Sequence, residues 1–199
     1  MGSDTVPTET VTSQIYLDSY MDAGVIVAMA LANELTPPEI ADPKAVVAGI
    51  LAFDPPSRAM FRPKDVPGFI ALAHRLREMF VSLDDENVDA AAEQLNSMLA
   101  AHPAHPYLAK EDGVWRLHHH PADAPLVPMY TSICAEAMAR MIGSGYAERF
   151  GICDASNCNR VFFDNSKNGT RRFCSVTCQN RVKTAAFRLR QAQGKPSRR

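Results

Sequence analysis

Apolar residues recur along most of the chain with the 3.6-residue period of α-helices. Between residues 107 and 118 the period shortens to two around an Asp-Gly pair, which predicts one β-hairpin. Proline pairs after Thr36 and Asp54 are interpreted as helix stops. We therefore expect a mainly α fold, with a helical N-terminal domain at residues 14–145 that carries one small β-hairpin. Its helices are predicted at 14–35, 43–53, from 65 to 80, from Asp84 or Asp85 to 99, and at 129–141.

Charge divides the chain into two parts. From Arg149 to Arg199 there are 12 Lys or Arg and 2 Asp or Glu, a net charge of +10. The preceding residues hold the other 9 basic and 20 acidic residues, a net charge of −11, and the whole chain has a net charge of −1. An acidic body with a basic tail suggests an anionic partner, although a solvated basic terminus has the same charge pattern.

The positions of the cysteines favour a metal-binding module with an anionic partner over a solvated basic terminus. Four of the five are Cys153, Cys158, Cys174 and Cys178, two close pairs separated by a length of chain that fits a hairpin. This spacing is typical of a closed Cys₄ zinc site, so we expect one structural Zn²⁺. An iron–sulfur cluster is the competing metal, and it is disfavoured because no three cysteines are closely spaced.

Residues 149–194 are too few to bury a large core, so we expect the metal ion to hold this segment. The first cysteine pair predicts a knuckle. Residues 159–163 and 171–173 are predicted to pair as strands across an Asn-Gly turn. Ser175 is predicted to cap a helix that carries the last cysteine. Knuckle, hairpin and helix describe a small α+β, treble-clef-like zinc finger.

Basic side chains of this finger are candidate DNA contacts. Arginine contacts phosphates bidentately and recognises guanine in a major groove, and asparagine recognises adenine. Asn180 and Arg181 can instead bond inside the zinc unit, which would leave phosphate contacts to the outer Lys and Arg side chains. The predicted DNA-binding set is Arg160, Arg171, Arg172, Asn180, Arg181, Lys183, Arg188 and Arg190.

The C-terminal motif resembles a known module. It runs Cys153-x4-Cys158-x-Arg160-Val161-Phe162-x-Asp164-x-Ser166, then Arg171-Arg172-Phe173-Cys174-Ser175, then Cys178-Gln179-Asn180-Arg181-x-Lys183. This pattern resembles the bacterial CGNR zinc finger, and the layout of the preceding residues resembles the ABATE domain that such fingers follow. The resemblance implies a stress-linked transcription regulator with a DNA-binding finger. It places the four metal ligands on the four cysteines and the Asn-Arg-x-Lys signature on Asn180, Arg181 and Lys183.

Other conspicuous residues are given structural roles. Cys134 lies in an apolar helical context and is expected to be a buried thiol. The histidines at 118–120, with His102 and His105, are expected to be solvated or to line a ligand rather than to bind a second metal. Trp115 is expected to anchor packing. Of the candidate stacking aromatics Phe162, Phe163 and Phe187, at least two are expected to be core residues.

Together these features predict a cytoplasmic, DNA-binding transcriptional regulator whose helical domain senses a signal, such as a small-molecule effector, or forms a homodimer. The globular composition (46% hydrophobic, 22% charged) excludes wholesale disorder, and we expect neither a membrane span nor a secretory signal. A closed Cys₄ site leaves no catalytic metal position, and no catalytic motif stands out, so we expect a non-enzyme. RNA binding and a zinc-stabilised protein-interaction module are the alternatives.

Overall fold

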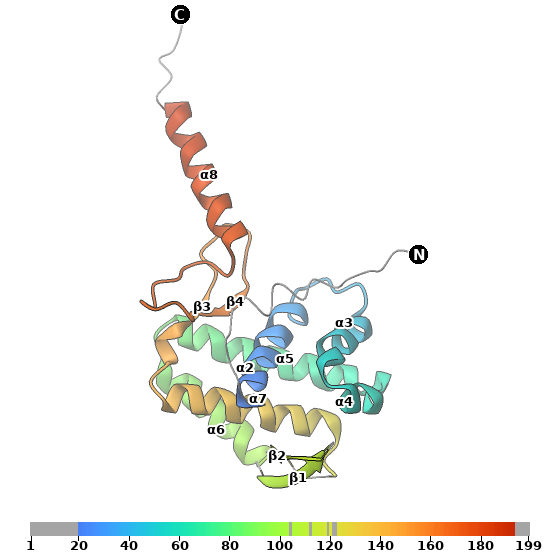
Figure 1. Ribbon diagram of the computed structural model, residues 1–199. Coiled ribbons are helices and arrows are strands. Elements are labelled where there is room, and N and C mark those ends of the chain that lie inside the picture. Colours follow the sequence, from blue (N-terminus) through green and yellow to red (C-terminus); the bar gives the residue numbers. More distant parts are fainter. Residues whose placement is uncertain (1–19, 104, 112, 119, 121–122, 194–199) are drawn as a thin grey trace, which may run out of the picture.

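A bundle of helices forms the body of the protein, and one long helix projects from it (Figure 1). The computed structural model describes residues 20–193 except 104, 112, 119, 121 and 122. The first six residues of the helix predicted at 14–35, and the tail cations Lys195, Arg198 and Arg199, lie outside this range. The described helices are α2 (Tyr20–Glu34), α3 (Pro43–Ile50), α4 (Pro55–Met60), α5 (Val66–Asp84), α6 (Val88–Ala101), α7 (Leu126–Gly143) and α8 (Val176–Gln193). Short 3-10 helices are η1 (Leu51–Phe53), η2 (Pro63–Asp65) and η3 (Ala147–Arg149), and the strands are β1 (Tyr107–Glu111), β2 (Val114–His118), β3 (Phe150–Ile152) and β4 (Val161–Phe163).

The core of the body lies where α2 packs against α5 and α7. Leu31, Phe69 and Met138, one from each helix, are all fully buried. Gly24 lets α2 approach α7 closely, since a Cβ there would lie 2.6 Å from Cβ of Ala137 on α7. The mainly α prediction is therefore confirmed, and the apolar stripes face one common core.

Two helix starts differ from the predicted boundaries. Asp54 ends the helical segment predicted at 43–53, as the C-cap of η1, but it also begins a helix that was not predicted: its carboxylate accepts a hydrogen bond from the Ser57 N–H, and the two prolines that follow occupy the first turn of α4. Proline is well suited to that turn because the N–H it lacks has no helical partner there. The N-cap of α6 is Asn87, whose side chain accepts from the Ala90 N–H, rather than Asp84 or Asp85.

The predicted hairpin is present, with β1 and β2 antiparallel, but its side chains differ from expectation. Trp115 is 63% exposed with Lys110 over its ring, so its predicted role as a packing anchor is wrong. His118 and His120 are both buried rather than solvated, and the His118 ring stacks on Tyr107 at 5.2 Å between centroids. The buried His118 and His120 therefore form an aromatic cluster with Tyr107 at one end of the hairpin, while Trp115 faces solvent.

The finger also pairs its strands differently from the prediction. β4 pairs with β3, which immediately precedes the first cysteine, and not with residues 171–173. The Arg171 N–H instead donates to the Asp164 carboxylate at 2.7 Å, and the Arg172 carbonyl accepts a hydrogen bond from the Asp154 N–H at 3.0 Å. Because that carboxylate takes the Arg171 N–H, residues 171–173 do not form a second ladder.

Candidate metal centre and basic helix

Four cysteine sulfur atoms meet at the base of α8. Cys153 follows β3, Cys158 follows a tight turn, Cys174 precedes α8 and Cys178 lies in its first turn. The four Sγ atoms all lie within 4.8 Å of one another, with 3.7 Å between Cys158 and Cys174 and 3.6 Å between Cys174 and Cys178. Tetrahedral zinc with Zn–S bonds of ~2.3 Å requires sulfur atoms about 3.8 Å apart. The donor set therefore fits Zn²⁺.

Local backbone geometry brings these thiols together. Asn157 adopts a positive φ of 63°, which allows the Cys158 N–H to bond back to Ala155 O at 3.0 Å. Ser175 caps α8 as predicted, since its Oγ accepts a hydrogen bond from the Cys178 N–H at 3.2 Å. The Cys174 N–H donates to Cys153 Sγ at 3.3 Å, the type of contact that stabilises a thiolate.

The thiols differ in acidity. The hydrogen bond from the Ser175 side chain lowers the pKa of Cys178 to about 7, whereas burial raises the pKa of Cys153 and Cys174. Zinc binds thiolates, so metal binding must displace protons from the last two. Cys134, on α7, is fully buried as predicted, and burial raises its pKa as well. That thiol is a core side chain and lies apart from the sulfur cluster.

Half of the predicted DNA contacts are bonded within the protein. Arg160 pairs with Glu34 at 2.7 Å, and Arg172 pairs with Asp154 at 2.6 Å. Arg171 donates to the carbonyls of Phe173 and Cys174 and lies over the Phe162 ring. Arg181 donates to Cys178 Sγ at 3.7 Å, so it bonds inside the zinc unit, which was the alternative to DNA contact for this residue.

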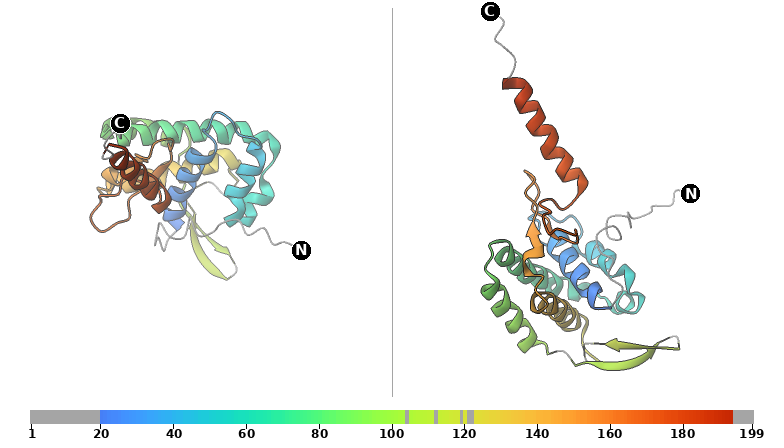
Figure 2. Two further views of the ribbon diagram at one scale, coloured as in Figure 1. Left: turned by 90° about the horizontal axis from the view of Figure 1, so that it is seen from above. Right: turned by 60° about the vertical axis from the view of Figure 1, so that its left-hand side comes forward.

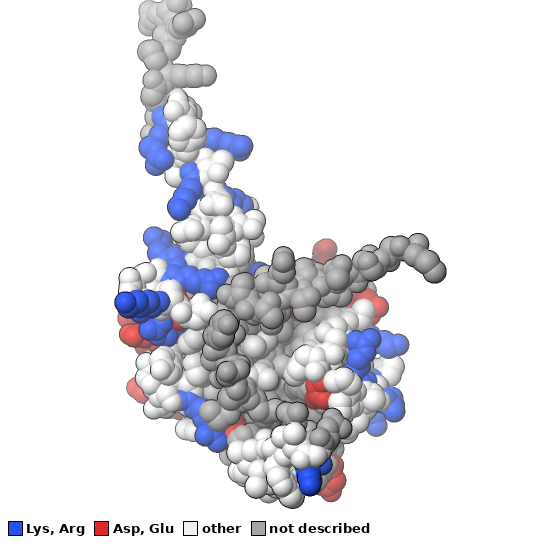
Figure 3. Space-filling view, viewed as in Figure 1, with Lys and Arg blue, Asp and Glu red and all other residues white. Residues whose placement is uncertain are grey.

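The other half lies on α8 and faces solvent. Asn180, Lys183, Arg188 and Arg190 are exposed, and their side chains make no hydrogen bond or ion pair with any described residue. No acidic residue occurs anywhere in α8. Figure 3 shows Lys and Arg gathered along this helix, whereas the body carries both signs of charge. Of the candidate aromatics, Phe162 and Phe163 are buried as expected and Phe187 is 55% exposed.

Comparison with protein families matches both parts of the chain. Residues 149–191 match the CGNR zinc finger. Residues 24–145, more than half of the chain, match ABATE, which is described as "Putative stress-induced transcription regulator". The chain belongs to the ABATE family. No curated protein matches the sequence.

The CGNR match and the four clustered sulfurs give this ABATE protein one structural zinc ion. Neither matched family is described as an enzyme. Within the described part of the chain, no helix combines the length and apolar character that a membrane span requires.

In this ABATE protein, the finger is joined to the body by side chains that cap both edges of its small sheet. The Asn33 amide on α2 bonds twice to Val161: its Nδ2 donates to the carbonyl at 3.0 Å, and its Oδ1 accepts from the N–H at 2.7 Å. On the other edge, Asp84 at the end of α5 accepts from the Ile152 N–H at 2.7 Å. Arg77 of α5 donates to the carbonyl of Asn159. Sequence patterns did not indicate these residues, since each acts on backbone far along the chain.

Strand β4 belongs to both hydrophobic cores. Val161 and Phe163 pack into the core of the body, whereas Phe162 packs beside the cysteines with Ala155 and Val182. Because neighbouring residues of a strand point to opposite faces, one short strand joins the two cores. The finger of this ABATE protein is therefore packed against the body.

Asp164 is a further structural residue of the finger, and the charge pattern of the sequence did not indicate it. Its two oxygens accept hydrogen bonds from the backbone N–H groups of Ser166, at 2.8 Å, and Arg171, at 2.7 Å. Burial alone would raise the pKa of Asp164, but these bonds and the nearby Arg149 guanidinium outweigh it and hold that pKa below its ordinary value. The sequence does hold one signal for this role: an Asp two residues before a Ser is typical of an Asx turn, in which the Asp side chain accepts a hydrogen bond from the backbone two residues on.

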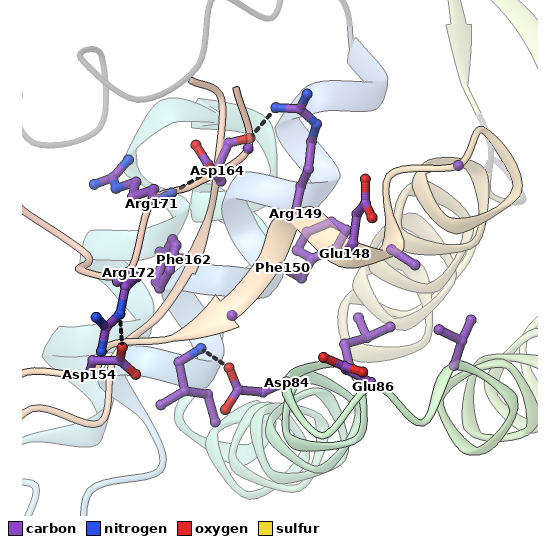
Figure 4. Close-up of a pocket in the computed structure, with 17 residues that line it drawn as sticks. Asp84, Glu86, Glu148, Arg149, Phe150, Asp154, Phe162, Asp164, Arg171 and Arg172 are labelled. Carbon is purple, nitrogen blue, oxygen red and sulfur yellow. Dashed lines mark hydrogen bonds and ion pairs between the residues drawn. The ribbon is translucent and has the colours of Figure 1, made fainter. Parts of the chain in front are cut away.

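A pocket of about 620 Å³ lies where the finger meets the body (Figure 4). Its walls come from the end of α5, from η3 and β3, and from the loops that hold Asp154 and Asp164. The arginines that line it, Arg149, Arg171 and Arg172, already bond to carbonyls or to Asp154. Any molecule that entered this pocket would contact both the body and the finger.

Proposed function

We propose that this protein is a DNA-binding transcriptional regulator in which zinc, held by Cys153, Cys158, Cys174 and Cys178, fixes the base of a DNA-contacting helix. The finger at 149–194 would contact DNA, and the helical domain at 14–145 would sense a signal or form a dimer. The protein would act in the cytoplasm and without catalysis.

One observation carries the proposal: a helix with four cations and no acid stands clear of the body at the zinc cluster (Figures 1 and 3). The first turns of α8 pack on the finger core through Val182, and beyond it residues 183–185 and 187–191 are exposed. Such a charge distribution attracts a polyanion to the helix, while the acidic body disfavours wider contact.

Duplex DNA is favoured over RNA because of the aromatic residues. RNA modules stack bases on several exposed aromatic side chains. Of the three candidate stacking aromatics, Phe162 and Phe163 are buried and Phe187 alone is exposed. In a competition between duplex DNA and structured RNA of equal length, the zinc-loaded protein should retain the duplex.

The test is anisotropy of a labelled random-sequence duplex titrated with zinc-loaded protein between 50 and 200 mM salt. About four neutralised phosphates should give a log–log slope near −3.6. Arg188→Ala should reduce the magnitude of the slope by about one phosphate contact. Arg140→Ala, a surface cation of α7 paired with Glu136, is the matched control and should leave it unchanged. Absence of duplex binding by zinc-loaded protein at 50 mM salt would refute the proposal.

The contacts between body and finger suggest how a signal would reach DNA. A change in α2 or α5 moves Asn33 or Asp84, and each of these residues holds one strand of the finger sheet. Dimer formation by the body is a separate proposal, and mass photometry at working concentration decides it, since a monomer throughout would exclude it.

A further inference from the structure

The two sides of α8 have different surroundings. Cys178 and Val182 lie on the side that packs against the zinc cluster and the finger core. Successive residues of an α-helix turn by about 100°, so positions 180, 183, 187 and 190 share a side that points away from that core. Asn180, Lys183, Phe187 and Arg190 are all exposed there. We name these four residues the outer side of α8.

Nothing described in the protein covers this outer side. Figures 1 and 2 show α8 leaving the body along its axis, so most of the helix is accessible from that direction. The helix has 18 residues and is therefore about 27 Å long. A major groove about 12 Å wide admits an α-helix, and a cationic helix without acidic residues matches the charge of the groove.

The composition of the outer side suits contact with bases as well as phosphates. Asparagine pairs bidentately with N6 and N7 of adenine, and an apolar side chain such as phenylalanine contacts the thymine methyl group. Phe187 is 55% exposed beside two cations and belongs to neither of the two hydrophobic cores among the described residues. Arg181 is the neighbouring candidate for base contact, but its guanidinium is directed to Cys178.

We infer that α8 lies in the major groove with its outer side toward the bases, where Asn180 selects an adenine and Phe187 selects a thymine. Asn180 and Phe187 are seven residues apart, about 10.5 Å along the helix axis, which corresponds to about three base-pair steps. Lys183 and Arg190 then neutralise phosphates or contact guanine. This inference rests on the proposed function and adds which residues determine sequence preference.

The test begins with duplexes selected from a random pool by zinc-loaded wild-type protein. Asn180→Ala should weaken binding to the selected duplex by about 5- to 150-fold and remove the preference at one A·T pair. Phe187→Ala should remove a preference for thymine about three pairs away. Replacing that thymine by uracil, which lacks the methyl group, should weaken the wild type but leave Phe187→Ala unaffected.

Two controls separate base contact from folding. Asn165→Ala removes an exposed amide in the finger loop. Leu189→Ala removes a side chain that is 63% exposed and lies on the opposite side of α8 from the outer side. Both should retain the wild-type base preferences, and all variants should keep their zinc content and circular dichroism spectrum.

The outcomes distinguish this inference from the proposed function. If the wild type binds no duplex, both are overturned. If the wild type selects a sequence but Asn180→Ala and Phe187→Ala keep the same base preferences, α8 does not contact bases through this side and the inference alone is overturned. Loss of the two preferences with both controls unchanged supports it.

Discussion

The amide of Asn33 is the most informative single contact to remove, because it holds the finger to the body. It lies on α2 and bonds to both backbone groups of Val161, 128 residues away in sequence. Val161 is 3% exposed, so water cannot easily replace the lost partner. Asn33→Ala therefore removes two hydrogen bonds and leaves a buried N–H and a buried C=O unsatisfied.

The magnitude follows from that geometry. A typical hydrogen bond contributes about 1 kcal/mol net, and an unsatisfied buried group raises the loss to about 1–3 kcal/mol. Two such groups give an expected decrease of about 2–6 kcal/mol in the free energy of unfolding. Asn33→Asp should also destabilise, because it keeps the acceptor for the Val161 N–H but places an oxygen against the Val161 carbonyl.

Urea denaturation followed by circular dichroism, at one fixed concentration of free zinc, measures this loss, since bound metal shifts apparent stability. Asn165→Ala, at an exposed loop position, is the matched control and should change stability by less than about 0.5 kcal/mol. An Asn33→Ala protein as stable as that control would refute the view that this amide fixes the finger to the body.

Three further predictions concern the body, the metal and the finger loop. Gly24→Ala should lower the free energy of unfolding by about 1–3 kcal/mol because the added Cβ would overlap α7. Gly49→Ala is the control: the added Cβ has open space there, so the change should be neutral or stabilising by up to about 1 kcal/mol. If urea denaturation shows equal changes in stability for the two variants, the close packing of α2 on α7 is contradicted. Cys174→Ser should lose most of its zinc by atomic absorption, and Cys134→Ser should keep it; full zinc content in the first would exclude that thiol as a ligand. Asp164→Asn should destabilise at neutral pH, and the difference from wild type should shrink as the pH falls below about 4 and through the lowered folded-state pKa, because only the ionised carboxylate contributes. A difference that stays constant from pH 7 to pH 3 would show that ionisation plays no part.

Sequence patterns predicted those features that depend only on residues close together in the chain. The apolar period of a helix reports its own buried face, so most helices were predicted within a few residues of their observed bounds. Ser175 was predicted as the cap of α8 because a cap depends only on the next three residues. The spacing of the cysteines likewise predicted the metal cluster without any knowledge of the fold.

Predictions failed where the partner of a group lies elsewhere in the chain. Trp115 is large and apolar, but its burial depends on whether another element covers the hairpin, and Leu108, Val114 and Leu117 are exposed as well. Residues 171–173 have strand-like composition, yet β4 pairs with β3 and the Asp164 carboxylate takes the Arg171 N–H. Neither competition can be seen in a local window of sequence.

The sequence by itself determined that the C-terminal segment binds one zinc ion, is strongly basic and ends in a helix, because ligand spacing, charge and helix period are properties of neighbouring residues. Only the tertiary structure decided which of the predicted cations pair with a carboxylate. Glu34 engages Arg160 from 126 residues away, and Asp154 engages Arg172, whereas Lys183 and Arg188 remain exposed on α8. Whether a cation can bind another molecule depends on which carboxylates and carbonyls folding brings next to it. The distances between these groups are set only in the folded chain.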